Sequence, residues 1–221
     1  MNKEQIVNQT ADYIKTKLTG EGSGHDWWHV YRVWKNAVHI SKHENVDLFV
    51  VELAALLHDI ADWKFHDGND DVGPQLAREW LKKLEVDEIV ISHVCQIIKD
   101  ASFKGSRVVT KMKSTEGMVV QDADRLDAIG AIGIARAFAS GAKFNESFYD
   151  SVIAVPEYKD ETEYIKAKGK VGRTTINHFY EKLLLLKELM NTAAAKKIAK
   201  KRHKIMKEYL ENFFQEWEGK D

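Results

Sequence analysis

Histidines and aspartates gather in three short segments of this sequence, and together they offer the side chains of a metal site. The segments are HDWWHV at 25–30, LLHDIAD at 56–62 and QDADRLD at 121–127. Neutral imidazole nitrogens and carboxylate oxygens are good ligands for divalent transition metals. We therefore expect one site that is assembled from three parts of the chain.

In the first segment, His25 and His29 are one helical turn apart, so both can face the same cavity. Asp26 has the short side chain that is preferred at a helix N-cap, which predicts that a helix begins here. A lone histidine is more often a packing residue than a ligand, and for either histidine alone that interpretation is favoured. Trp27 and Trp28 are likewise expected to pack, as the wall of the site.

In the second segment, His58 and Asp59 follow the strongly apolar run VVELAALL, where an unpaired charge would be costly to bury. A divalent cation would neutralise this charge, and the negative end of the helix dipole would add to the attraction. Asp62 follows His58 by four residues and so shares its helical face. We expect Asp62 to orient or deprotonate a water molecule beside the metal.

The third segment places Asp122, Asp124 and Asp127 directly before AIGAIGIARAF, which is apolar nearly all round. A merely solvated face does not explain three acids in this position, so one of them is predicted to be a ligand. Two structural alternatives stay open, because Asp127 could cap the following helix and Arg125 could pair with a carboxylate.

These segments resemble the HD-domain phosphohydrolase superfamily, in which an ordered H…HD…D set from separate helices surrounds one metal ion. The stretches GHDWWH, LLHDIADWKF, IIKDASFKG, QDADRLDAIGAIGIARAF and TTINHFYEKLL are similar to small bacterial HD proteins of the YpgQ/YedJ type, over most of the chain. The resemblance implies that the metal ligands are His29, His58, Asp59 and Asp124. The pattern departs from the related 5'-deoxynucleotidases at Asp62, where those enzymes have Glu.

The resemblance also implies an activity, which is hydrolysis of (deoxy)nucleoside triphosphates to a monophosphate and pyrophosphate. One divalent ion is expected, whether Mn, Ni, Co, Fe, Zn or Mg. The residues themselves indicate only metal-dependent hydrolysis of a phosphate ester or anhydride. A nucleoside monophosphate nucleotidase, a cyclic-nucleotide phosphodiesterase and a non-enzymatic helical nucleic-acid-binding protein stay open as alternatives.

Residues close to these motifs are predicted to act on the substrate. Lys64 is expected to bind phosphate during catalysis, and His25 to donate to a phosphate or protonate the leaving oxygen, because imidazole titrates near neutrality. The other substrate-binding candidates are His93, Lys104, Arg125 and His178. Each cation could instead be an ordinary surface charge, and His178 could simply stabilise packing. His25 and His93 are also the candidates for a second metal.

The elements that must position these residues are helices. Two prolines and few alternating apolar runs predict an all-α protein, a compact HD-domain helical bundle with a C-terminal long-helix extension. Helices are expected near 2–18, 26–44, 47–62, 71–84, 87–100, 116–127, 128–140, 174–190 and 192–217. We predict a single domain over 1–221, with its HD core at about 20–140 and the extension at about 141–221.

Three other stretches have a recognisable composition. KGSRVVTKMKSTEG at 104–117 predicts a mobile loop, with a short β-hairpin as an alternative, and 149–175 predicts an excursion or lid. In the last helix, lysines are expected on the solvated side of an apolar helical face and not on a nucleic-acid-binding surface. These lysines are Lys197, Lys200, Lys201 and Lys204.

Composition limits the partners and the compartment. The 33 Lys and Arg against 34 Asp and Glu give a formal net charge of -1, so no global positive field attracts nucleic acid or an anionic membrane. The single cysteine, Cys95, excludes an intramolecular disulfide and fits a reducing compartment. No segment reaches the roughly 20 apolar residues of a membrane span. We predict a cytoplasmic protein that binds a small-molecule nucleotide, with nucleic acid not expected and a homodimer left open.

Overall fold

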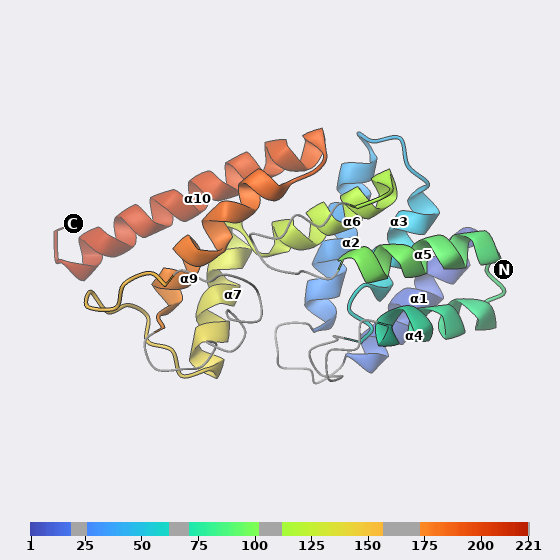
Figure 1. Cartoon of the computed structure of the whole chain (residues 1–221), viewed down its shortest axis with the longest axis horizontal. Helices are drawn as coiled ribbons and strands as arrows, with labels where there is room; N and C mark the ends of the chain where they lie inside the picture. The colour runs from blue at the N-terminus through green and yellow to red at the C-terminus, as the bar shows by residue number, and fades with distance from the viewer. Residues whose placement is uncertain (19–25, 62–70, 102–111, 157–172, 221) are drawn as a thin grey trace. The chain divides into compact units, whose positions relative to one another are not determined.

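The computed structural model describes residues 1–18, 26–61, 71–101, 112–156 and 173–220, and these are mainly helical (Figure 1). Within these ranges there is no β-strand, and an isolated parallel bridge joins Ser147 to Thr174. The prediction of an all-α protein is confirmed. The described residues up to Asp124 form one compact unit, and those from Arg125 onward form a second.

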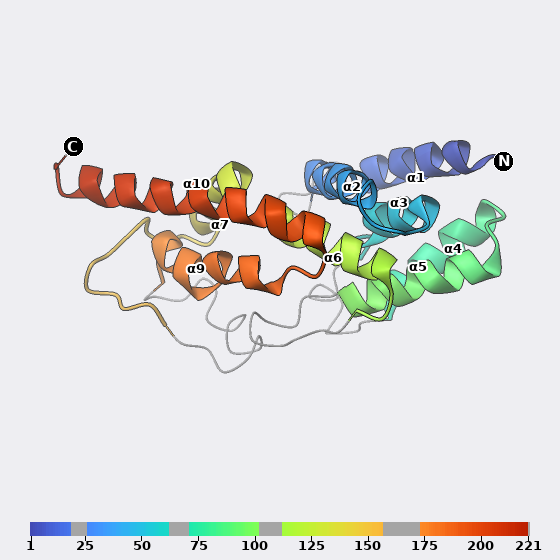
Figure 2. The ribbon, with the colours of Figure 1, turned by 90° about the horizontal axis from the view of Figure 1, so that it is seen from above.

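The N-terminal unit is built around a central apolar helix. Its helices are α1 (Lys3–Lys17), α2 (Trp27–Ser41), α3 (Leu48–Leu57), α4 (Val72–Lys83), α5 (Glu88–Ala101) and most of α6 (Thr115–Asp127). Helix α3 packs against α1, α2 and α5, and α4 lies alongside α5 (Figure 2). Because every residue of α3 except Glu52 is apolar, this surrounding layer is what its sequence requires.

Helix α3 ends earlier than its apolar pattern predicts. It begins after Asp47, whose side chain accepts a hydrogen bond from the Phe49 N–H, and it ends at Leu57. The chain then tightens, since the Ile60 N–H donates to the Leu57 carbonyl at 3.1 Å. The expected end at 62 is wrong, and His58 therefore follows the last helical residue, at the negative end of the helix dipole.

The C-terminal unit holds helix α7 (Gly130–Lys143), α9 (Thr175–Glu181), the 3₁₀ helix η2 (Leu183–Leu189) and the long helix α10 (Ala193–Trp217). Helix α10 packs against α7 and η2. The single helix expected over 174–190 is wrong, because Lys182 leaves the helical region with φ -139 and ψ -58. The tighter η2 turn then buries Leu183 and Leu186, whose spacing of three matches its repeat.

A buried ion cluster ties the start of α9 to the chain that follows α7. The Nη2 of Arg173 lies 2.7 Å from Oε2 of Glu181, and its Nη1 lies 3.6 Å from Oε1 of Glu146. The Thr175 N–H donates to the Ser147 carbonyl at 2.9 Å in the same region. Helix α7 approaches so closely here that a Cβ on Gly141 would collide with the Thr175 hydroxyl.

Several expectations concern residues that the structure does not describe in full. Residues 102–111 and 157–172 lie outside the described ranges, and with them most of the expected loop and lid. The single-domain organisation stays a prediction, and its expected core boundary near 140 differs from the division after Asp124. None of the described helices is both long and apolar enough to cross a membrane.

Candidate metal centre

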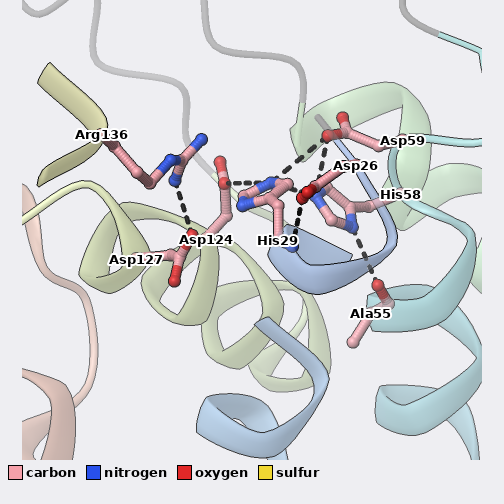
Figure 3. Close-up of polar contacts among 8 residues, drawn as sticks. All are labelled: Asp26, His29, Ala55, His58, Asp59, Asp124, Asp127 and Arg136. Carbon is pink, nitrogen blue, oxygen red and sulfur yellow. Dashed lines mark hydrogen bonds and ion pairs between the residues drawn. The ribbon is translucent and has the colours of Figure 1, made fainter. Parts of the chain in front are cut away.

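Four side chains from three parts of the N-terminal unit lie close together, three of them within reach of one another and the fourth beside His29 (Figure 3). They are His29 of α2, His58 and Asp59 after α3, and Asp124 of α6. The Nε2 atom of His29 lies 3.3 Å from Oδ2 of Asp59, 3.5 Å from Oδ1 of Asp124 and 3.4 Å from Nε2 of His58. The Nε2 atom of His58 lies 3.5 Å from the same Asp59 oxygen.

His29 is positioned by the start of α2. The Oδ1 atom of Asp26 accepts a hydrogen bond from the His29 N–H at 2.9 Å, which confirms the predicted N-cap. The His29 side chain is only 1% exposed, and Val30 and Val33 of the same helix are buried in the core. The imidazole therefore sits on a fixed backbone with little room to turn away.

His58 is oriented by a backbone carbonyl of its own helix. Its Nδ1 atom lies 2.8 Å from the Ala55 oxygen, which can only accept a hydrogen bond. The proton is thus assigned to Nδ1, and Nε2 keeps its lone pair on the side of His29 and Asp59. A partner that fixes the tautomer in this way is the usual support of a metal-binding histidine.

The separations fit a single cation. Two ligand atoms that each lie about 2.1 Å from one ion are about 3.0 Å apart in octahedral geometry and about 3.4 Å apart in tetrahedral geometry. One ligand atom from each of His29, His58 and Asp59 lies within 4.8 Å of the others, and the closest pairs are at 3.3–3.5 Å. Two imidazoles and two carboxylates form a nitrogen and oxygen donor set that suits Mn, Fe, Co, Ni or Zn.

Comparison with known proteins gives the family. The profile of the HD domain family matches residues 27–129, a range that contains all four converging side chains. YpgQ of Bacillus subtilis is 36% identical over 227 residues, which cover 100% of this chain and 98% of that protein. This chain belongs to the HD-domain superfamily. The resemblance inferred from the motifs is confirmed.

Crystal structures of HD proteins agree with this assignment. An HD-superfamily hydrolase from Bacillus thuringiensis is 40% identical, with a TM-score of 0.76 over 98% of this chain and 99% of that one. The structure of Bacillus subtilis YpgQ in complex with ADP is 34% identical, with a TM-score of 0.74 over 97% and 100% of the two chains. The chain is thus a metal-dependent HD-domain phosphohydrolase, and the non-enzymatic alternative is wrong.

Of the three acids in QDADRLD, Asp124 has a carboxylate oxygen 3.5 Å from the His29 imidazole. Asp122 is fully buried in α6, and Asp127 forms an ion pair with Arg136 of α7 at 2.6 Å. The alternative that Asp127 caps the next helix is wrong, because the N-cap of α7 is Ile129, without a side-chain cap bond. The HD-domain ligand pattern and the geometry therefore select the same aspartate.

Arg125 does not have the surroundings expected of a phosphate-binding residue. Its side chain is buried in the C-terminal unit, and its Nη1 donates to the backbone carbonyl of Leu189. The alternative that it pairs with a carboxylate is not the contact seen for this nitrogen. The geometry gives no support to the substrate-binding prediction for Arg125.

The remaining predicted residues are not brought to the cluster by anything the structure describes. The Nε2 atom of His93, in α5, lies 3.7 Å from the carboxylate of Glu116, in α6. His178 is half-buried in α9 of the C-terminal unit. Their roles stay predictions. The same holds for residues outside the described ranges, namely His25, Asp62, Lys64 and Lys104.

Two features of the site were missed in the sequence. The Ala55 carbonyl has no side-chain signature, and only the early end of α3 brings it to His58. Trp28 was expected to be part of the packed wall of the site, but its side chain is 59% exposed, whereas Trp27 is half-buried. A helical wheel gives some warning, because Trp28 is seven residues before the exposed Lys35 and so shares its face.

Proposed function

We propose that this chain hydrolyses nucleoside triphosphates to a nucleoside monophosphate and pyrophosphate, with one divalent cation held by His29, His58, Asp59 and Asp124. The convergence of the four side chains, with imidazole and carboxylate atoms 3.3–3.5 Å apart, carries this proposal. The ADP bound by YpgQ, a similar protein over nearly its whole length, supports a nucleotide as the substrate. A cytoplasmic location, expected from the lone cysteine, belongs to the same proposal.

The protein's own contribution is to hold these four side chains in place and in the right protonation state. A bound divalent cation would lower the pKa of a water molecule and polarise the phosphoryl group. Ala55 keeps His58 in the tautomer whose Nε2 is free of a proton, and Asp26 fixes the backbone of His29. The Asp124 side chain is 37% exposed, which leaves this part of the cluster accessible to a ligand.

Three residues outside the described ranges are proposed to complete the chemistry. Asp62 would orient or deprotonate the attacking water, because it closely follows the His58–Asp59 pair in the sequence. His25 would protonate the leaving oxygen, and Lys64 would neutralise charge that develops on the phosphoryl oxygens. These roles come from sequence position and from the HD family pattern.

The identity of the released product tests the proposal. The protein is stripped of metal with a chelator, reloaded with Mn²⁺ and incubated with a panel of nucleoside triphosphates, monophosphates and cyclic nucleotides. We expect pyrophosphate from triphosphates only when metal is present, and its loss in Asp59→Asn. The matched control is Asp12→Asn, which neutralises an exposed carboxylate of α1 in the same unit.

Two other outcomes would contradict the proposal. Release of orthophosphate alone, from monophosphates, would assign the chain as a nucleotidase. Equal pyrophosphate release by the chelated and the reloaded protein would show that the converging side chains do not act through a metal ion.

A further inference from the structure

Trp28 differs sharply in exposure from its neighbour in the sequence. Its indole is 59% exposed, while His29, the next residue, is 1% exposed and belongs to the metal centre. A single exposed apolar side chain is common on protein surfaces and by itself means little. Two features distinguish Trp28 from such residues: it precedes His29 directly, and its indole is packed against other aromatic rings.

Trp28 is the first of three aromatic side chains of α2 that contact one another in a row. Its indole meets Tyr31 edge to face, with ring centroids 5.9 Å apart and an interplanar angle of 80°. Tyr31 meets Trp34 in the same way, at 6.3 Å and 84°. The Trp34 Nε1–H then donates to Glu52 Oε1 of α3 at 3.0 Å. The row thus runs from an exposed indole to the helix that precedes the His58–Asp59 pair.

The row also carries a positive charge on its flank. The Lys35 ammonium lies 3.9 Å from the centroid of the Trp34 ring and 5.3 Å from that of Tyr31. Edge-to-face contacts and a cation over a ring face each restrict how aromatic side chains rotate. An exposed ring that is held in this way loses little conformational entropy when a ligand stacks on it.

Helix geometry places the indole and the metal ligand on adjoining sectors of one helix end. Successive residues of an α-helix are about 1.5 Å apart along the axis and about 100° apart around it. Trp28 and His29 therefore extend from the same turn of α2 in neighbouring directions. A nucleotide whose phosphates lie at the metal centre would extend its base about one sugar away, and Trp28 is an exposed aromatic side chain next in sequence to a residue of that centre.

We propose that the Trp28 indole is the platform on which the base of the nucleotide stacks while its phosphates lie at the metal centre. The inference rests on the proposed function and adds a binding site for the base of the nucleotide. An indole face has no hydrogen-bonding pattern, so it accepts every base, and larger purines stack on it more strongly than pyrimidines. It makes no distinction between ribose and deoxyribose.

Equilibrium binding of two ligands that resist hydrolysis tests this inference. The ligands are α,β-methylene ADP and methylenediphosphonate, which share the same phosphonate group and differ by the nucleoside. Their Kd values are measured by calorimetry on the full-length, Mn²⁺-loaded wild type, Trp28→Ala and Trp28→Phe. A control variant, Trp217→Ala, removes an exposed indole of the C-terminal unit.

Among the variants, only Trp28→Ala should lose the contribution of the base to nucleotide affinity. We expect its Kd for the methylene ADP to rise about 10-fold, within the roughly 5- to 150-fold range of a base–aromatic stack. The Kd for methylenediphosphonate should stay at the wild-type value, Trp28→Phe should keep most of the nucleotide affinity, and Trp217→Ala should keep all of it.

Contrary results separate this inference from the proposed function. An unchanged nucleotide Kd in Trp28→Ala would overturn the stacking platform, and so would an equal loss for both ligands, because Trp28 would then act on the metal centre and not on the base. A wild type that binds methylene ADP more tightly than methylenediphosphonate but releases no pyrophosphate would overturn the proposed cleavage alone. A wild type that binds neither ligand would overturn both.

Discussion

The metal centre of the N-terminal unit and the Glu146–Arg173–Glu181 cluster of the C-terminal unit both hold two carboxylates beside nitrogen-bearing side chains, but they balance the charge differently. In the second cluster, the side chains of Glu146, Arg173 and Glu181 are 8%, 4% and 1% exposed, and the guanidinium of Arg173 contacts both acids. The metal centre instead sets its carboxylates beside imidazole nitrogens, one of which keeps a lone pair because of the Ala55 carbonyl.

The contrast shows how a structural ion cluster can be told from a metal site. A buried carboxylate needs a compensating charge, and Arg173 supplies one within the chain. Neutral imidazoles supply none, and a bound divalent cation would supply it at the metal centre. Even Arg173 does not fully balance two acids: burial raises the pKa of Glu181, Arg173 opposes this shift, and Glu146 adds to it.

The largest expected change in the free energy of unfolding concerns the Glu146–Arg173–Glu181 cluster, in which Arg173 supplies the positive charge. Arg173→Met would leave two carboxylates buried without their guanidinium, and it should lower the free energy of unfolding by about 3–5 kcal/mol. Urea unfolding followed by circular dichroism measures this loss. A loss below about 1 kcal/mol would show that Glu146 and Glu181 do not depend on Arg173 as the geometry indicates.

At the metal centre, the free energy of unfolding should increase when an ion is added, and it should change little when one acid is removed from the metal-free protein. In wild type, Mn²⁺ at about 100 times its Kd should raise the free energy of unfolding by about 2.7 kcal/mol. Asp59→Asn should remove this gain while leaving the metal-free stability near that of wild type, because it removes one of the acids without stranding another. Urea unfolding with and without Mn²⁺ measures both quantities, and an intact gain in the variant would contradict the ligand role.

The pH dependence of stability should report the incomplete balance at Glu181. Its raised pKa means that the folded chain keeps a proton that the unfolded chain releases, so its contribution to the free energy of unfolding falls as pH rises above the ordinary range of Glu. Glu181→Gln has no such proton to lose. We expect wild-type stability relative to this variant to decline as pH rises, in urea titrations at several pH values. A relative stability that increased with pH would reverse the sign of the shift.

The smallest effect on the free energy of unfolding should come from Thr174, the uncharged residue that follows Arg173. Thr174 caps α9, its hydroxyl accepting a hydrogen bond from the Asn177 N–H at 3.1 Å. Thr174→Ala should cost about 1 kcal/mol of unfolding free energy, and Thr174→Ser, which keeps the hydroxyl, should cost less. Neither change should alter the pH dependence assigned to Glu181, and an altered pH profile in Thr174→Ala would mean that the profile reports local unfolding of α9.

The sequence predicted most of the helices for clear physical reasons, and the resemblance to the HD family implied the set of proposed metal ligands. Apolar residues repeat with the helical period over several turns in α2 and α10, so these helices were expected to within a few residues. His29, His58 and Asp59 have side chains that are hard to bury without a cation, which made them recognisable as a group.

The features that were missed depend on contacts that no local pattern encodes. The run LLLLKEL has too few turns to distinguish a 3₁₀ repeat from an α-helical one, so the break at Lys182 was not foreseen. Arg125 follows Asp124 directly, yet its guanidinium donates to the Leu189 carbonyl, which lies 64 residues away in the sequence. The exposed fraction of Trp28 depends on which other parts of the chain pack against it, and the local sequence only partly predicts this.

The count of metal ions per chain is the most direct test of the account. Calorimetric titration of the chelated protein with Mn²⁺ should show one tight site per chain in wild type and in Asp12→Ala, whose exposed carboxylate lies on α1. The tight site should be lost in Asp59→Ala. A tight site that survives Asp59→Ala with wild-type affinity would contradict the assignment of His29, His58, Asp59 and Asp124 as the metal centre.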